Sequence, residues 1–518
     1  MRFFRALLAG AFLGCSAANA SDLRIGLAAD VTSMDPHFLN LQPNVNIGWH
    51  VFDALTHVDE NARLIPGLAV SWRAVDATTW EFKLRRGVRF HDGSEFTAED
   101  VVFSIERTLQ VPNGQFPTFT RRIVAKEIPD PYTLRLKTAV PYAMVPYDLD
   151  SVFIVSKKAA AGARPEDFDS GRAMIGTGPF RFVRFARGDR VELSRNDRYW
   201  GISGGKGPAW DKVIFRIVPT DGARLAGLLS GDLDLIEQVP TADQQRIQRD
   251  ALLETAQKVS WRTIFFHLDQ RERVPGLTDK AGKPLARNPF RDARVRRALS
   301  QAINRQAIAE RLMDGAALPA SNLVSPPVFG YAQDLQPDAY DPEGAKRLLA
   351  EAGYPDGFAM TLSATNNRYV NDEQIAQAVA QMLARVGLRV RVEAFPVNVY
   401  LPKGAKGDFA FAMLGWGSFS GDLALRSLVA TADAKKGFGA FNWSGYSNAK
   451  VDELLERAFA TVDEKAREAL AREAMRAAMR DYAVIPVHHQ VATWAMKKGL
   501  TYAPRTDEFT FAHHVRPR

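Results

Sequence analysis

The stretch at residues 408–422 (DFAFAMLGWGSFSGD) brings several ligand-binding chemistries to the end of one predicted apolar strand. Gly415 and Gly417 lack a Cβ atom, so another chain can approach the backbone closely there. Trp416 between them offers a flat apolar wall, and we include the hydroxyl of Ser418 among the candidate contacts. Groups of this kind hold a ligand without transforming it, and they predict a binding site.

Two charged positions extend this candidate site. Arg368 and Tyr369 follow a predicted strand at residues 360–364, and open α/β sheets bind ligands at the carboxyl ends of their strands. An arginine there can hold a ligand carboxylate through two parallel hydrogen bonds. Asp422 ends the Gly-rich loop, and because a buried carboxylate needs a cation, we expect it to receive a ligand ammonium group. The structural alternatives are that Arg368 caps a surface loop and that Asp422 caps the following helix.

Catalytic and metal-binding patterns are poorly represented. The sequence has no G-x-S-x-G elbow, no H-E-x-x-H helix and no G-x-x-x-x-G-K-[ST] loop, although paired-carboxylate chemistry stays open. The pairs His488, His489 and His513, His514 suggest metal ligands, but adjacent side chains on a strand point to opposite faces. We therefore predict no enzyme activity, no metal ion and no cofactor, with a secreted hydrolase as the alternative.

The amino terminus has the features of a secretory signal peptide. Arg2 and Arg5 precede an apolar run at residues 6–13, and small residues end at Ala20, which predicts cleavage before position 21. The run is well short of the roughly 20 residues that a bilayer requires. The one cysteine, Cys15, lies within this peptide, so the mature chain has no thiol; lipid attachment at Cys15 is the alternative.

Length and charge narrow the class further. A chain of 518 residues predicts about three domains of roughly 150 residues each. Loss of Arg2 and Arg5 lowers the net charge from +8 by two, to +6, and the remaining basic residues are scattered. Nucleic-acid binding would need a concentrated basic face with stacking aromatics, so we exclude it. A basic solvated surface explains the charge, and an acidic ligand or an anionic membrane surface is the alternative.

Local patterns predict alternating strands and helices. Residues 80–84 alternate as a strand, and Thr97 with Asp100 forms a capping-box pattern that begins a helix. Strand, helix and strand follow at residues 213–218, 221–230 and 232–236, the parallel unit of an α/β sheet. We also predict one long amphipathic helix over residues 292–313, with a solvated face formed by its arginines: Arg294, Arg296, Arg297 and Arg305.

Seven stretches, spread over nearly the whole mature chain, resemble the family 5 extracellular solute-binding proteins, the periplasmic receptors of peptide and nickel ABC importers. They lie at residues 87–109, 176–182, 196–200, 228–236, 290–305, 348–357 and 446–454. The resemblance implies an α/β, two-lobed periplasmic-binding-protein fold of the cluster C type, with an extra subdomain and a ligand cleft between the lobes.

This resemblance also implies a domain organisation. After the signal peptide at 1–20, we expect lobe I at residues 21–66, 176–268 and 488–518, subdomain Ib at 67–175, and lobe II at 269–487. Two crossovers between the lobes suit hinge closure over a ligand. In the family the loop at residues 32–42 lies at the cleft, which makes Asn40 and Gln42 candidate contacts, and a loop around Phe119 reaches toward the ligand.

One position departs from the family pattern. Peptide-binding members hold the peptide ammonium with an aspartate three residues after the tryptophan, and here that position is Phe419. Asp422 is the expected replacement, because GWGSFSGD is more similar to glutathione-binding members than to general peptide receptors. We expect a monomer that captures a small peptide-like solute and delivers it to an inner-membrane ABC permease. Receptors for nickel chelates, opines or oligosaccharides, and a chemoreceptor partner, are the alternatives.

Overall fold

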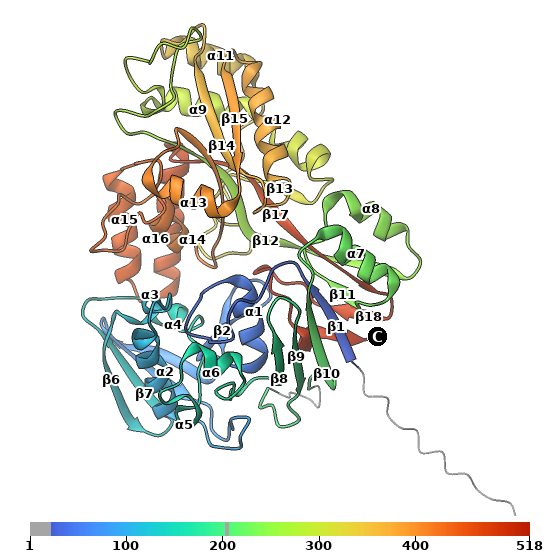
Figure 1. Cartoon of the computed structure of the whole chain (residues 1–518). Coiled ribbons are helices and arrows are strands. Elements are labelled where there is room, and N and C mark those ends of the chain that lie inside the picture. Colours follow the sequence, from blue (N-terminus) through green and yellow to red (C-terminus); the bar gives the residue numbers. More distant parts are fainter. Residues whose placement is uncertain (1–21, 202–206) are drawn as a thin grey trace, which may run out of the picture.

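The computed structural model describes residues 22–201 and 207–518, so the expected signal peptide and Cys15 lie outside the described residues. One continuous eleven-stranded sheet runs through both lobes (Figure 1). Its order is β15 (Arg389–Phe395), β14 (Ala359–Thr365), β16 (Phe411–Gly417), β12 (Leu253–Leu268), β17 (Ile485–Lys497), β11 (Leu235–Ile236), β1 (Asp22–Leu27), β10 (Lys212–Ile217), β9 (Arg190–Arg195) and β8 (Phe180–Ala186), while β13 (Ala317–Pro319) pairs with β17.

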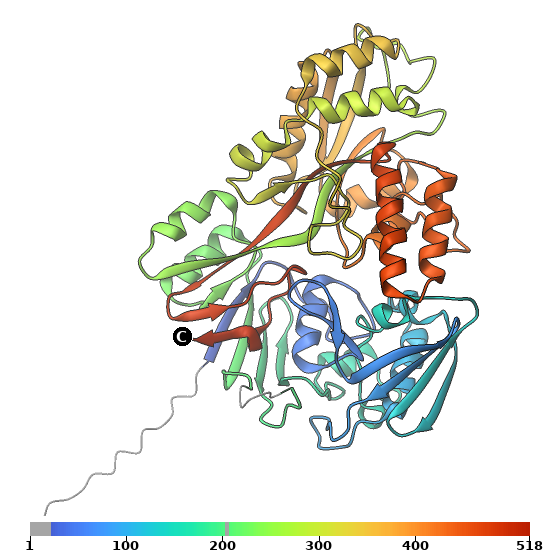
Figure 2. The ribbon, with the colours of Figure 1, turned by 180° about the vertical axis from the view of Figure 1, so that it is seen from behind.

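Strands β12 and β17 connect the lobes. They pair antiparallel along their lengths and form two long ribbons that cross the molecule diagonally (Figure 2). Their register shifts between Val259 and Thr263, and again between Ile264 and Phe265. A bulge bends a strand and increases its local twist, so this segment is the natural place for the chain to change direction between lobes.

Subdomain Ib has its own four-stranded sheet, which lies within the expected residues 67–175. The strand order is β4 (Ala69–Asp76), β5 (Thr79–Leu84), β7 (Thr133–Thr138) and β6 (Ile123–Asp130). Helix α2 (Ala98–Gln110) begins with the predicted capping box of Thr97 and Asp100, and the side chains of Val101 and Ile105 on its apolar face are fully buried.

The remaining elements cover the sheets or connect them. The helices are α1 (Gln42–Val51), α3 (Pro117–Thr120), α4 (Val145–Asp148), α5 (Lys157–Ala160), α6 (Pro165–Asp169), α7 (Asp221–Ser230), α8 (Thr241–Arg249), α9 (Ala293–Ala302), α10 (Arg305–Ala307), α11 (Pro342–Glu351), α12 (Asp372–Ala384), α13 (Val397–Lys406), α14 (Gly421–Leu428), α15 (Ala449–Ala460) and α16 (Glu464–Arg480). Short 3-10 or π turns lie at Pro289–Arg291, Ile308–Leu312 and Ala512–His514, and short strands form the pairs β2 (Thr56–Val58) with β3 (Leu64–Pro66) and β18 (Leu500–Tyr502) with β19 (Val515–Pro517).

Subdomain Ib and lobe II also touch away from the connecting strands. One hydrophobic cluster contains Tyr147 from α4 as well as Leu428 and Phe459 from α14 and α15. The backbone N–H of Ala143 donates to the carbonyl of Phe459 at 2.8 Å. The lobes are therefore held on one side by β12 and β17 and on the other by this packed contact.

The predicted long helix over residues 292–313 is wrong. Helix α9 ends at Ala302, and Asn304 adopts a non-helical backbone while its side chain caps the short turn that follows. The predicted solvated face is also wrong for two arginines. Arg296 and Arg305 are only 3% and 5% exposed. The guanidinium of Arg296 donates to the carbonyl of Asp481 and so connects α9 to the turn before β17, and that of Arg305 donates to the carbonyl of Pro486 and so connects α10 to β17.

No helix within residues 22–201 and 207–518 combines the length and the apolar character needed to cross a bilayer.

Candidate functional site

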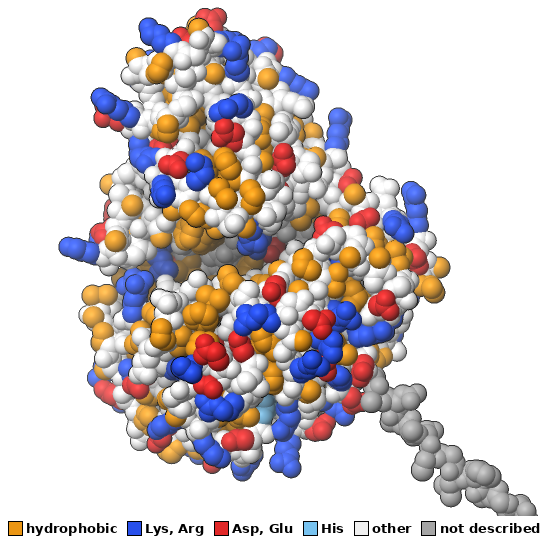
Figure 3. Space-filling model, in the orientation of Figure 1, with side chains coloured by type: hydrophobic (Ala, Val, Ile, Leu, Met, Phe, Trp, Pro, Cys, Tyr) orange, Lys and Arg blue, Asp and Glu red, His pale blue; other side chains and the backbone are white. Residues whose placement is uncertain are grey.

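The molecular surface is hollowed between the upper lobe and the lower part of the molecule, with apolar and basic side chains at the rim (Figure 3). The carboxyl end of β16 lies where the two lobes meet. Gly417 at this end pairs with Arg262 of the connecting strand β12, and Arg262 in turn contacts Glu508 of the carboxyl-terminal segment.

One edge of β16 is only partly used. Strand β14 pairs with it through Phe411 and Ala412, and no strand of the described chain continues that pairing to Gly417. On this edge, the hydroxyl of Tyr400 donates to the carbonyl of Met413 at 2.6 Å, and that of Tyr369 to the carbonyl of Gly415 at 3.0 Å. Because alternate residues of an antiparallel ladder direct their backbone groups to the same side, Gly417 presents its N–H and C=O along this edge.

The two glycines have a packing role inside the protein. A Cβ at Gly415 would lie 2.6 Å from the ring of Tyr369, and a Cβ at Gly417 would lie 2.5 Å from Nε1 of Trp261. Both positions share one face of β16, so glycine is required there because Tyr369 and Trp261 cover the strand. Trp416 faces the other way and packs against Phe441, with ring centroids 4.8 Å apart.

Arg368 has no ionic partner in the described chain. Its guanidinium lies near the Tyr369 ring, 5.5 Å from the centroid, and makes no hydrogen bond or ion pair among residues 22–201 and 207–518. The side chain is exposed, yet desolvation lowers its pKa, followed by the positive charge of Arg262. An anionic ligand group would offset this shift, because an opposite charge nearby favours the charged form of the guanidinium.

Arg262 is already neutralised. Its Nη2 lies 2.8 Å from Oε2 of Glu508, and the other carboxylate oxygen, Oε1, accepts hydrogen bonds from the Ser260 hydroxyl at 2.6 Å and the Gln490 amide at 3.2 Å. Burial raises the pKa of the Glu508 carboxyl, but the charge and hydrogen bonds of Arg262 outweigh it, so the pKa lies below its usual value. Arg368 is thus left as the cation of this cluster that is available to a ligand.

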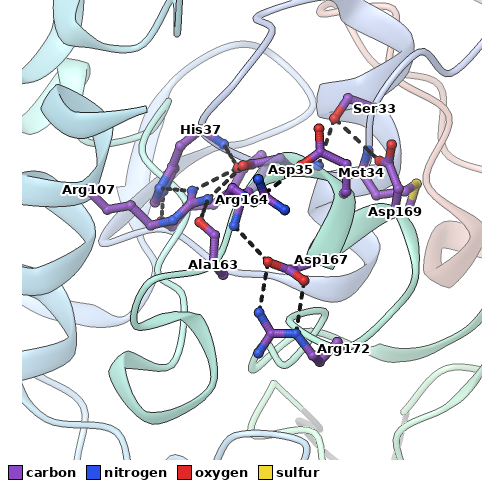
Figure 4. Close-up of polar contacts among 12 residues, drawn as sticks. Ser33, Met34, Asp35, His37, Arg107, Ala163, Arg164, Asp167, Asp169 and Arg172 are labelled. Atoms are coloured by element: carbon purple, nitrogen blue, oxygen red, sulfur yellow. Dashed lines mark hydrogen bonds and ion pairs between the residues drawn. The ribbon is translucent and has the colours of Figure 1, made fainter. Parts of the chain in front are cut away.

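Buried charged side chains hold the loop at residues 32–42 in place. Asp35 forms a bidentate ion pair with Arg107, whose Nη2 and Nη1 lie 2.6 and 2.8 Å from its carboxylate oxygens (Figure 4). At the end of the loop, the amide of Gln42 donates to the Glu508 carbonyl at 3.2 Å, which joins it to the cluster around Arg262. Asn40 is exposed, and its backbone N–H donates to Gln115.

Asp422 does not have the environment that we expected. Its carboxylate is fully buried, with Oδ2 2.7 Å from Nε of Arg467, and it also accepts from the hydroxyl of Ser420. Burial raises the pKa of this carboxyl, but Arg467 and the hydrogen bonds lower it further, so the net shift is downward. A carboxylate that receives a ligand ammonium group has no cation of the protein beside it, whereas Asp422 is already paired with Arg467. The N-cap residue of helix α14 is Ser420, whose side chain makes no capping hydrogen bond, and Asp422 in the first turn accepts from the backbone N–H of Leu423 at 2.9 Å.

Ser418 and Phe119, two further predicted contacts, interact with other parts of the protein. The hydroxyl of Ser418 donates within its own loop, to the Ser420 carbonyl at 2.8 Å. Phe119 in α3 packs against Phe116, with centroids 5.9 Å apart, and against the same large hydrophobic cluster that Trp261 and Trp416 contact. The structure therefore brings Arg368, Tyr369, Gly415 and Gly417 together and joins Gln42 to them through Glu508.

Three residues of this cluster, namely Trp261, Arg262 and Glu508, were not predicted from the sequence. The adjacent bulky and charged side chains in SWRT interrupt the apolar pattern of β12, and this interruption is a sequence signal that could have indicated the bulge. Glu508 adopts a positive φ of 65°, a conformation that no sequence pattern indicates for glutamate.

The histidine pairs do not form a metal site in the part of the chain that the structure describes. No group of three or more potential metal ligands among His, Cys, Asp and Glu gathers there. His488 and His489 lie on β17, and His513 and His514 on a 3-10 turn instead of the expected strand.

Comparisons with known proteins agree with this architecture. The chain is 28% identical over 511 residues to the glutathione-binding protein GsiB of Salmonella typhimurium (strain LT2), covering 95% of this chain and 94% of the relative. It is 30% identical over 442 residues to the dipeptide-binding protein of Escherichia coli (strain K12), covering 79% and 78%. The structure of the ABC transporter-associated periplasmic binding protein DppA from Helicobacter pylori in complex with peptide STSA matches with a TM-score of 0.76 at 25% identity, covering 96% and 98%.

A model of the bacterial extracellular solute-binding proteins, family 5 (middle), matches residues 63–433. That is more than half of the chain, and it spans the connecting strand β12, Arg368 and the β16 loop. The protein belongs to the family 5 bacterial extracellular solute-binding proteins.

Proposed function

We propose that this protein captures a small peptide-like solute between its lobes, a di- or oligopeptide or glutathione, and delivers it to an inner-membrane ABC permease. The relatives bind glutathione and dipeptides by name, and they are binding proteins, not enzymes. In this proposal the chain is exported, acts as a monomer in the periplasm and releases its ligand chemically unchanged.

The observation that carries the proposal is the unpaired edge of β16. The pairing of β14 with β16 ends at Ala412, so the backbone groups of Gly417 lie beyond the last residue of β16 that pairs with β14. An extended peptide can add to such an edge as a further strand, because its main chain supplies alternating donors and acceptors. The Tyr369 hydroxyl occupies the Gly415 carbonyl, so the peptide would pair beyond it or displace the hydroxyl.

Arg368 supports the same class of solute. A peptide or glutathione carries a carboxylate, and the unpartnered guanidinium of Arg368 can bind one through two parallel hydrogen bonds. Trp416 and Tyr369 add apolar surface on either side of the strand end. Gln42 is the proposed contact from lobe I, so closure would bring both lobes onto the ligand.

A thermal-shift panel tests this function. Protein refolded to remove carried-over ligand is heated with glutathione, di- to pentapeptides, nickel and its chelates, opines and oligosaccharides. A ligand at about 100 times its dissociation constant adds about 2.7 kcal/mol to the free energy of unfolding. A shift with glutathione or peptides that Arg368→Ala weakens supports the proposal. If only nickel, an opine or a sugar shifts the protein, the peptide-type assignment is wrong.

Recovery of the ligand tests the absence of chemistry. The protein is incubated with the peptide that shifts it, and the solute is then analysed by mass spectrometry. Intact peptide at a stoichiometry near one supports a receptor, whereas turnover products would establish the hydrolase alternative.

A further inference from the structure

Three sequence stretches that carry the family resemblance converge on a pocket outside the β16 site. The pocket has a volume of about 380 Å³, and its walls are formed by residues 89–93, Arg181 and residues 196–198. These positions belong to subdomain Ib and lobe I, and none of them lies on β12, β14 or β16, so the pocket is separate from the proposed ligand site.

The pocket is held together by bonds that fix its shape. Nε2 of His91 is hydrogen-bonded to the carbonyl of Gly178 at 3.0 Å, and the amide of Asn196 donates to the same carbonyl at 2.9 Å. Arg181 spans the floor, since it donates to the His91 carbonyl at 2.5 Å and to Oδ1 of Asn196 at 3.3 Å. His91 itself is uncharged near neutral pH, because burial lowers its pKa to about 4.

The charges around the pocket are unbalanced. Its lining includes three arginines, Arg89, Arg181 and Arg198, none of which forms an ion pair within residues 22–201 and 207–518. Arg89 donates to the Gly93 carbonyl at 3.0 Å, and the guanidinium of Arg198 makes no hydrogen bond in that part of the chain.

The two carboxylates of the lining are engaged elsewhere. Asp92 accepts from Ser94 and lies 3.4 Å from Nζ of Lys158, and Asp197 lies 2.7 Å from Nε of Arg195. The lining therefore carries three guanidinium groups and two carboxylates, and the carboxylates form their ion pairs with Lys158 and Arg195 instead of with these three arginines. Guanidinium forks match the geometry of phosphate and sulfate oxygens, which accept several hydrogen bonds at once.

We infer that this pocket binds a phosphate-class oxyanion, held by Arg89, Arg181 and Arg198, independently of the solute in the cleft. The anion has two possible sources, free phosphate or the headgroup of an anionic lipid, and both present the same oxygens. The inference does not depend on the proposed transport function, because the two sites share no residue.

Calorimetric titration with inorganic phosphate at constant ionic strength tests the inference. We expect saturable binding at one site, weakened at least tenfold by Arg198→Ala and by Arg89→Ala. Arg184→Ala is the matched control, since Arg184 is an exposed arginine on β8 outside the pocket, and it should leave binding unchanged. Circular dichroism melting of each variant confirms that loss of binding is not loss of fold.

Two further arms identify the source and the location. Flotation with phosphatidylglycerol vesicles that depends on Arg198, without binding of free phosphate, would assign the site to a lipid headgroup. If Arg368→Ala abolishes phosphate binding and Arg198→Ala does not, the anion lies in the cleft and the inference is wrong. The inference is also wrong if neither phosphate nor the vesicles bind in a way that depends on Arg198. Neither of those results would affect the peptide panel.

Discussion

Nε of Arg467 lies 2.7 Å from Oδ2 of Asp422, and the two side chains are 2% and 0% exposed. The guanidinium also lies 4.5 Å from the ring centroids of both Tyr147 and Phe329. The Tyr147 ring in turn stacks on Phe419, at 5.6 Å and an interplanar angle of 10°. This ion pair therefore anchors the loop after Trp416 to lobe II and carries the packed contact with subdomain Ib.

Asp422→Ala should lower the stability of the fold as its main effect, with any effect on ligand affinity following from that. Removal of one partner leaves the Arg467 charge buried without compensation, which costs about 3–5 kcal/mol in the free energy of unfolding. Denaturant unfolding measures this cost. Asp408→Ala is the control, since Asp408 forms a half-exposed pair with Lys403 at 3.4 Å that is worth about 0–1 kcal/mol. Unchanged stability of Asp422→Ala with lost binding would instead support the ammonium receptor.

Arg368→Ala should weaken ligand binding and leave the stability of the fold nearly unchanged. Its guanidinium has no ionic partner in the described chain and feels the positive charge of Arg262, so its removal should leave the unfolding midpoint nearly unchanged. Loss of a charge-assisted contact to a ligand carboxylate should weaken binding by about 2–5 kcal/mol, measured by calorimetry with the peptide that the panel identifies. Arg297→Ala, an exposed arginine of lobe II, is the control; equal losses in both variants would refute the specific contact.

Gly417→Ala should destabilise the strand end through Trp261. The added Cβ would lie 2.5 Å from Nε1 and 2.7 Å from Cδ1 of the indole, so the ring or the strand must move, at a cost of about 1–3 kcal/mol. A double-mutant cycle with Trp261→Ala measures the coupling. We expect Gly417→Ala to cost little in the Trp261→Ala background. If the two changes are additive, the glycine is needed for another reason, such as approach of the ligand.

Short-range sequence patterns predicted many of the helices and strands, but they did not predict contacts between residues that are distant in the sequence. The capping box at Thr97 and helix α7 were predicted from spacing alone, since neighbours along the chain determine them. Arg296 and Arg305 were placed on a solvated face because their carbonyl partners lie more than 180 positions away.

The same limit applied to the candidate site. The strands that end near Trp416 and before Arg368 were both predicted, because strand length is a local property, but the segment from Gly415 to Gly417, expected as part of a Gly-rich loop, belongs to β16. The role of Asp422 was not predictable from the loop. Its partner Arg467 is 45 positions distant on α16, and no spacing rule connects the two.

All nine histidines of the chain have lowered pKa values in the folded protein, and burial is the main cause for each. For His57 and His267 the pKa falls to about 3, and for His37 and His50 to about 4. Five carboxyl groups oppose this effect, because burial raises their pKa values: those of Asp53, Asp100 and Glu237, and to about 7 those of Asp148 and Asp150.

Stability should therefore fall as the pH drops below 6.5. An unfolded histidine binds a proton there while the folded one does not, so unfolding takes up as many as nine protons and releases at most five from the carboxyl groups. Each proton taken up contributes up to about 1.4 kcal/mol per pH unit. Denaturant midpoints at pH 7.5, 6.5 and 5.5 measure the trend. His267→Phe should reduce the slope by up to one proton, because His267 is buried beside Phe265 and Trp443 with neither ring nitrogen hydrogen-bonded in the described chain. A midpoint at pH 5.5 equal to or above that at pH 7.5 would show that the carboxyl groups dominate.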